Sequence, residues 1–284
     1  MYGGRLMPMD NMEINLRMVQ SHCIKIMEDI DKLCRKFEIR YSLTGGSVIG
    51  AYLYNGFIPW DDDIDIFVPR EDYDRIKDIF TEEKTANLGL SIKTPGMENH
   101  PFPFIKIYDI RTVVIDEIIS EQYPLHIWID VFPLDHFPDS DILHRLYLFT
   151  IRIFRTALKS KTARNGLSKG NPMIQKLFDA IYELLGGYRN LCSFMDSYAR
   201  WVNKQNSHSN HYGNGTWPEG RQDYFKKEWI FPFINHKFEN REFHIPLNYD
   251  KYLTQFYGDY LTPPPEEKRT RHSFKAYYVE DKDT

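Results

Sequence analysis

The chain has few cysteines and no long apolar run. Its three cysteines, Cys23, Cys34 and Cys192, are odd in number, widely spaced and without a Cys-x-x-Cys pair, which argues against a disulfide framework or a zinc site. No apolar run reaches the roughly 18 residues that cross a bilayer, and the N-terminus lacks the pattern of a secretion signal. We therefore expect a cytoplasmic protein, soluble or associated with the inner face of the membrane.

Positive charge is also scarce. A formal net charge of −4 argues against a nucleic-acid polymer as partner, because nonspecific affinity for phosphate backbones comes from accumulated Lys and Arg. The Gly-x-Ser-x-Gly and His-Glu-x-x-His signatures are missing, and Ala51-Tyr52 stands where a P-loop needs Lys and Ser or Thr. His208 and His211 have the spacing of zinc ligands but lie in a polar loop without a third ligand.

What the sequence does have is 42% hydrophobic residues, enough for a buried core. In residues 1–135, apolar spacing and β-prone runs predict helices and strands together. The expected helices are 16–37, packed on a sheet, 48–54 after a turn at Gly45-Gly46-Ser47, and 71–80. The expected extended segments are 41–44, 61–68, 104–108, 112–116 and 126–132.

Residues 136–284 differ, because helical spacing dominates there. We expect helices over 142–158, 173–185 and 191–202, followed by a polar loop over 205–220. The fold class is therefore predicted as α+β, with a catalytic core in 1–135. Residues 136–284 would then be a helical insertion and a C-terminal segment that complete the same single domain.

The string from Trp60 to Ile66 places four aspartates close together. If the segment is extended, Asp61, Asp63 and Asp65 share one face while Asp62 points away. Crowded carboxylates repel unless a cation neutralises them, and hard oxygen ligands suit Mg²⁺ or Mn²⁺. A solvated acidic turn is the alternative, but the apolar neighbours of the cluster favour a buried strand, where unpaired charge is costly.

Two further features extend this predicted site. Asp130 lies in the apolar run from Leu125 to Phe132, as a hydrogen-bonded core residue or as a third ligand or general base. Gly45, Gly46 and Ser47 open a helix and so offer backbone N–H groups to phosphate, which alone is a weak signal.

Together these motifs resemble the nucleotidyltransferase superfamily and, within it, the LicD family of phosphotransferases, to which fukutin-related proteins also belong. The strings that carry the resemblance are Gly46 to Ala51, Gly56 to Asp65, Trp128 to Asp135, Tyr257 to Tyr260, Pro264 and Arg269 to His272. They span nearly the whole chain. The resemblance implies a nucleotidyltransferase-like mixed β-sheet with flanking helices. It also implies transfer of phosphocholine, or a polyol phosphate such as ribitol or glycerol phosphate, from a CDP-linked donor to a sugar hydroxyl of a teichoic acid, capsule or lipopolysaccharide.

In this interpretation Asp63 and Asp65, with Asp61, hold the metal against the donor pyrophosphate, and Asp130 completes the site and deprotonates the acceptor hydroxyl. The predicted phosphate contacts are Gly45, Gly46, Ser47, Lys106, Arg269 and His272. The chain departs from the family at Leu53-Tyr54-Asn55, where a basic pair is common; Lys106, Arg111, Arg269, Arg271 or His272 would replace it.

Two alternatives remain open from the sequence. The chain could transfer a nucleotide from a nucleoside triphosphate, or it could be a non-catalytic glycan-binding protein, which its 19 Tyr, 19 Phe and 5 Trp would suit. The segment 142–161, which mixes apolar residues with Arg and Lys, is either a core-packing helix or a contact with the membrane of a lipid-linked glycan acceptor.

Overall fold

The computed structural model describes residues 8–81, 85, 87–167, 171–269 and 272–279. The strands are β1 Pro8–Ile14, β2 Ser42–Leu43, β3 Asp65–Pro69, β4 Leu90–Lys93, β5 Ile105–Asp116, β6 Leu125–His136, β7 His211–Asn214, β8 Phe225–Lys226, β9 Ile234–Phe238, β10 Arg241–Ile245 and β11 Phe274–Val279. The helices are α1 Leu16–Phe37, α2 Gly46–Ile49, the π-helix η1 Gly50–Tyr54, α3 Arg70–Ile79, α5 Asp141–Thr162, α6 Pro172–Leu184, α7 Gly187–Gln205, α8 Lys227–Ile230, α9 Tyr249–Tyr257 and the 3₁₀ helix η2 Glu266–Lys268.

One sheet organises the molecule. Within the described ranges it has nine strands in the order β1-β11-β5-β6-β3-β2, with β4 paired to β5 and β7 linking β6 to β8. β3 and β6 run parallel, whereas the other pairs are antiparallel. The predicted α+β class with a mixed sheet is therefore confirmed.

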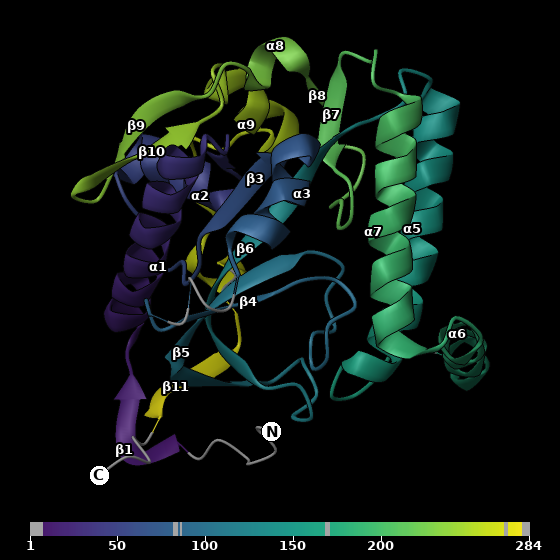
Figure 1. The fold of residues 1–284 in the computed structure, drawn as a ribbon, viewed down its shortest axis with the longest axis horizontal. Helices are drawn as coiled ribbons and strands as arrows, with labels where there is room; N and C mark the ends of the chain where they lie inside the picture. The colour runs from purple at the N-terminus through teal and green to yellow at the C-terminus, as the bar shows by residue number, and fades with distance from the viewer. Residues whose placement is uncertain (1–7, 82–84, 86, 168–170, 270–271, 280–284) are drawn as a thin grey trace.

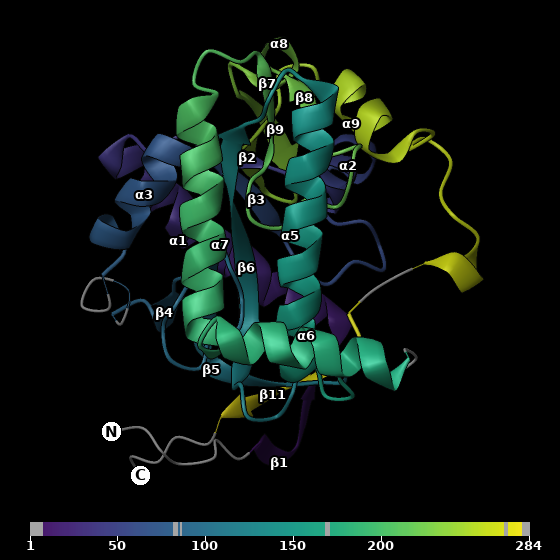
Figure 2. The same cartoon turned by 90° about the vertical axis from the view of Figure 1, so that its right-hand side faces the viewer.

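Helices cover both faces of this sheet. Figure 1 shows α1 on one side and the α5 and α7 pair on the other, and Figure 2 shows α6 lying across the ends of α5 and α7. The main core lies around the sheet and α1. A second core, which includes Phe137, Tyr147 and Met195, lies among α5, α6 and α7. No helix in the described part of the chain is both long enough and apolar enough to cross a bilayer.

The helix α1 has the bounds and the packing that its apolar spacing predicts. The Asn15 side chain caps it by accepting from the Met18 N–H at 3.0 Å. It ends where Glu38 adopts a left-handed φ of 54°. Its buried stripe packs against the sheet and contains Val19, Cys23, Ile26, Met27, Ile30 and Cys34.

Three sequence predictions of the fold are wrong. The segments 104–108 and 112–116 are one strand, β5, because an irregularity between Asp109 and Val114 shifts its register without ending it. The predicted strand 61–68 begins only at Asp65. The predicted loop 205–220 contains β7, which joins the sheet beside the end of β6. The domain boundary expected at residue 135 stays a prediction, although β7, β8 and β11 lie in the same sheet as β3.

Candidate active site

Three charged residues lie in one row across the sheet. Asp65 on β3 is opposite Asp130 on β6, and Asp130 is opposite Lys106 on β5. Directly opposed residues on adjacent strands project to the same face. The Lys106 Nζ lies 2.6 Å from Asp130 Oδ1, and both side chains are almost fully buried. The sheet thus brings Asp130 next to the aspartate string, as the sequence predicts.

The residues before Asp65 form a loop that contacts α1 through Gln20 and Cys23. The Gln20 Nε2 donates to the Asp61 carbonyl at 2.9 Å, and the Asp61 N–H closes a turn onto the Ile58 carbonyl at 2.9 Å. The Cys23 Sγ lies 3.7 Å from the Asp62 carbonyl. Gln20 was not identified from the sequence as a residue of the site. Its signal in the sequence is a polar residue on the apolar face of a helix, where a buried polar group needs a hydrogen-bond partner.

Because this loop does not alternate like a strand, Asp62 is not turned away from its neighbours, and that prediction is wrong. Asp62 Oδ1 lies 2.9 Å from His272 Nδ1, and Asp63 Oδ2 lies 3.5 Å from the same nitrogen. Among the described residues, Asp62, Asp63 and His272 are the group whose ligand atoms lie within 4.8 Å of one another. The predicted metal set of Asp61, Asp63, Asp65 and Asp130 is not gathered that closely, and stays a prediction.

The carboxylates nevertheless raise the pKa values of one another. Burial, followed by the charges of Asp63 and Asp62, raises the pKa of Asp61 to about 8. Burial also raises the pKa of Asp63 to about 6, with Asp62 and Asp130 adding to it and His272 opposing it. The pKa of Asp65 is raised by burial, Asp63 and Asp130. A partly buried set of hard oxygen donors that repel one another fits a divalent cation such as Mg²⁺ or Mn²⁺.

His272 supplies positive charge to this cluster from the C-terminal part of the chain. Burial lowers its pKa, but the hydrogen bond to Asp62 and the charges of Asp63 and Asp62 outweigh it and raise the pKa to about 9. Its ring lies edge-on to Trp128, with centroids 5.4 Å apart. An imidazolium here would suit the predicted phosphate contact. Arg271, named with it, lies outside the described residues.

Lys106 and Arg269, the other predicted phosphate-binding cations, contact aromatic rings. The Lys106 ammonium lies over the rings of Trp128 at 4.3 Å and Phe102 at 4.6 Å, besides its pair with Asp130. A phosphate would have to compete with Asp130 for it. Arg269 is exposed and its guanidinium stacks on Trp60 at 4.2 Å, so it lies beside the start of the aspartate loop.

The Gly45-Gly46-Ser47 turn packs against the segment that contains Asp61 and Asp65. The Gly45 N–H donates to the Tyr252 hydroxyl at 2.9 Å, and the Ser47 Oγ accepts from the Asp65 N–H at 3.0 Å. A Cβ on Gly46 would lie 2.9 Å from Asp61 Oδ2, which explains glycine at this close approach. The turn therefore has a structural role, and its predicted phosphate contact remains a prediction.

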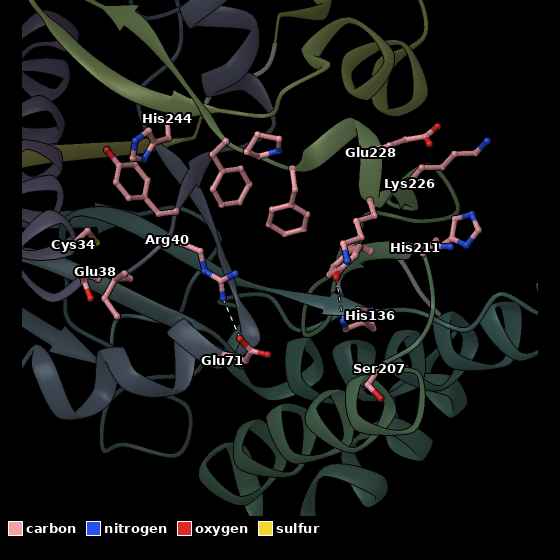
Figure 3. Close-up of a pocket in the computed structure, with 18 of the residues that line it drawn as sticks. Cys34, Glu38, Arg40, Glu71, His136, Ser207, His211, Lys226, Glu228 and His244 are labelled. Carbon is pink, nitrogen blue, oxygen red and sulfur yellow. Dashed lines mark hydrogen bonds and ion pairs between the residues drawn. The ribbon is translucent and has the colours of Figure 1, made fainter.

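A large cleft lies elsewhere on the molecule. It has a volume of about 1370 Å³ and is lined by residues that include Arg40, Glu71, His136, His211 and His244. Figure 3 shows the Arg40 and Glu71 side chains meeting across it, with Nη2 and Oε2 3.1 Å apart. His136 ends β6, six residues beyond Asp130 in sequence, so this cleft and the acidic site lie toward different ends of the sheet.

A mixed sheet that sets a Gly-Gly-Ser turn beside the aspartate loop and an aspartate of the neighbouring strand resembles the nucleotidyltransferase-type domain that the sequence predicts. Comparison with known families agrees with this class. Residues 38–141 match the nucleotidyltransferase domain of the family described as LicD/FKTN/FKRP. The matched segment includes all four predicted metal ligands.

Similar proteins extend this result. The chain is 28% identical to the lipopolysaccharide cholinephosphotransferase LicD of Haemophilus influenzae, over 94% of this chain and 99% of that protein. It is also 31% identical to an uncharacterised protein of Rickettsia typhi, over 42% of this chain and 36% of that protein. The similarity supports a transferase.

Proposed function

We propose that this chain is a metal-dependent phosphotransferase that moves phosphocholine or a polyol phosphate from a CDP-linked donor to a sugar hydroxyl of a cell-surface glycan. The observation that carries the proposal is the row of Asp65, Asp130 and Lys106 beside the Asp62, Asp63 and His272 group. The near full-length similarity to a lipopolysaccharide cholinephosphotransferase favours phosphocholine as the group and lipopolysaccharide over teichoic acid or capsule as the acceptor.

Four of the acidic residues have a proposed role. Asp61, Asp63, Asp65 and Asp130 would hold Mg²⁺ or Mn²⁺, which would neutralise charge on the donor pyrophosphate. Asp130, whose carboxylate Lys106 holds in place, accepts the proton of the acceptor hydroxyl. The hydroxyl oxygen then bonds to phosphorus, the bond from that phosphorus to the CMP oxygen breaks, and CMP leaves.

The cations and the glycine turn serve the donor phosphates. His272 and Arg269 border the aspartate loop from the C-terminal segment, where positive charge would attract the pyrophosphate. Gly45, Gly46 and Ser47 position Asp61 and Asp65 and are proposed to approach the donor. Lys106 contributes mainly through Asp130.

A donor panel tests this proposal. The pure protein would be incubated with Mg²⁺, isolated lipopolysaccharide and, separately, CDP-choline, CDP-ribitol, CDP-glycerol and nucleoside triphosphates, with products identified by mass. We expect CMP together with a phosphocholine or polyol-phosphate adduct on the glycan. Pyrophosphate and a nucleotide adduct would instead establish a nucleotidyltransferase, and glycan binding without any product would establish a non-catalytic binding protein.

A further inference from the structure

The helix α6 has large apolar side chains directed to solvent. All of its residues, Pro172–Leu184, are described, and Tyr182 is the single buried one. Met173 is 77% exposed, Leu177 58% and Leu184 87%. These positions follow the i, i+4, i+11 spacing of one helical face. A helix in a water-soluble protein normally turns such a face inward, so this face needs an apolar partner.

The neighbouring helix α5 continues the exposed apolar surface. Ile142, Leu146 and Phe149 are 77%, 57% and 61% exposed and also share one face by their spacing. Figure 1 shows α6 on the outer side of the α5 and α7 layer, away from the sheet, and Figure 2 shows it crossing the ends of both helices. The exposed apolar residues of these two adjoining helices are named here the α5–α6 surface.

Positive charge borders the α5–α6 surface. α5 and α6 together contain six Lys and Arg residues against Asp141, Asp179 and Glu183, in a chain of net charge −4. Arg145 pairs with Asp141 and Lys161 with Asp179. Arg152 and Lys176 are exposed, whereas Arg155 and Lys159 lie over the Trp217 ring at 4.1 and 5.3 Å. The basic residues expected to face a membrane over 142–161 therefore include Arg152 but exclude Arg155.

We propose that the α5–α6 surface docks the protein on an anionic lipid bilayer, with its apolar side chains inserted at the level of the headgroups. Exposed apolar stripes next to Arg and Lys match the apolar and anionic layers of such a surface. A second copy of this chain would bring its own Arg152 and Lys176 against the same basic border, which is unfavourable. The inference does not depend on the proposed reaction.

Vesicle co-sedimentation tests it. The full chain would be mixed with vesicles of phosphatidylcholine, with and without phosphatidylglycerol. We expect binding that is stronger with phosphatidylglycerol and that falls about tenfold or more in the Leu177→Glu/Leu184→Glu double variant, because two charges would enter the apolar layer. The matched control is Leu247→Glu/Leu261→Glu, at positions 41% and 58% exposed on either side of α9, which should bind as the wild type does.

Three results would overturn the inference. The first is that the wild-type chain does not bind vesicles. The second is that vesicle binding falls equally in the control variant. The third is that light scattering shows a wild-type dimer, which Leu177→Glu/Leu184→Glu dissociates. Because vesicle binding needs neither donor nor acceptor, loss of the proposed reaction in the donor panel would leave this result standing, and the reverse also holds.

Discussion

At the scale of single residues, Lys106 and Asp130 depend on each other. Their ion pair is 2.6 Å long and almost fully buried, and removing one partner leaves the other charge without compensation in a poorly solvated place. The sequence indicates both residues as functional candidates, but their pairing follows from the antiparallel register of β5 and β6.

We expect Lys106→Met to lower the free energy of unfolding by about 3–5 kcal/mol. The double variant Lys106→Met/Asp130→Asn should lose less, because it buries no unpaired charge. Urea denaturation of both variants measures this. Lys32→Met breaks an exposed pair with Asp29 and should change stability by less than about 1 kcal/mol; additive losses in the double variant would contradict the account.

His100 should make stability depend on pH. Burial lowers its pKa to about 3, despite its hydrogen bond to the Phe104 carbonyl. The folded protein therefore binds fewer protons at this residue than the unfolded chain, whose histidine has a pKa near 6.5. Its contribution to stability is present above about pH 6.5 and is lost as the pH falls toward 3.

We expect His100→Gln to flatten the fall of unfolding free energy between pH 7 and pH 4, measured by urea denaturation at several pH values. His208→Gln, at an exposed position, should keep the wild-type slope. Equal slopes for wild type and His100→Gln would show that folding does not lower the pKa of His100.

The residue-scale error at Asp62 has a physical cause. Alternation of side chains holds only where strand pairing fixes the backbone, and here pairing starts at Asp65. The contact of Asp62 with His272 joins residues 210 positions apart. The sequence could therefore predict an acidic cluster but not which of its oxygens approach His272.

At the scale of elements, long periodic helices were predictable and short strands were not. α1, α3, α5, α6 and α7 match their predicted ranges within a few residues, because a helical stripe repeats over several turns. β7, β8, β9 and β10 have two to five residues each, too few for a periodic signal. β7 pairs with the distant strand β6, whereas β9 and β10 pair only with each other, in a separate two-stranded sheet.

Arg70 joins three elements. Its guanidinium donates to Asp135 of β6 through Nε and Nη2 and to Asp196 of α7 through Nη1, each at 2.6 Å. The arginine itself begins α3 and its side chain is only 4% exposed. This bidentate contact attaches the helical layer to the sheet.

We expect Arg70→Met to lower the free energy of unfolding by about 3–5 kcal/mol, because two buried carboxylates lose their cation. Arg75→Met, on the same helix but with a side chain 49% exposed, should cost less than about 1 kcal/mol. Urea denaturation compares the two variants. Similar losses of unfolding free energy would show that the buried Arg70 contacts stabilise the fold no more than the exposed Arg75 contacts do.

At the scale of the whole molecule, the second half of the chain is less purely helical than its sequence suggests. β11 pairs with β5, and the residues just before it bring His272 to the aspartate loop. The predicted site thus depends on segments from both ends of the chain. Motif strings indicated these segments, but only the sheet topology explains how they meet.

The most direct test of the proposed function is Mg²⁺-dependent CMP release from the most active donor of the panel, by wild type, Asp65→Asn and the exposed control Asp78→Asn. We predict that wild type and Asp78→Asn release CMP with Mg²⁺ and stop when it is chelated. Asp65→Asn should be slower by about a thousandfold or more while keeping the wild-type circular dichroism spectrum. A folded Asp65→Asn variant with near wild-type CMP release would contradict the assignment of the acidic cluster as the active site.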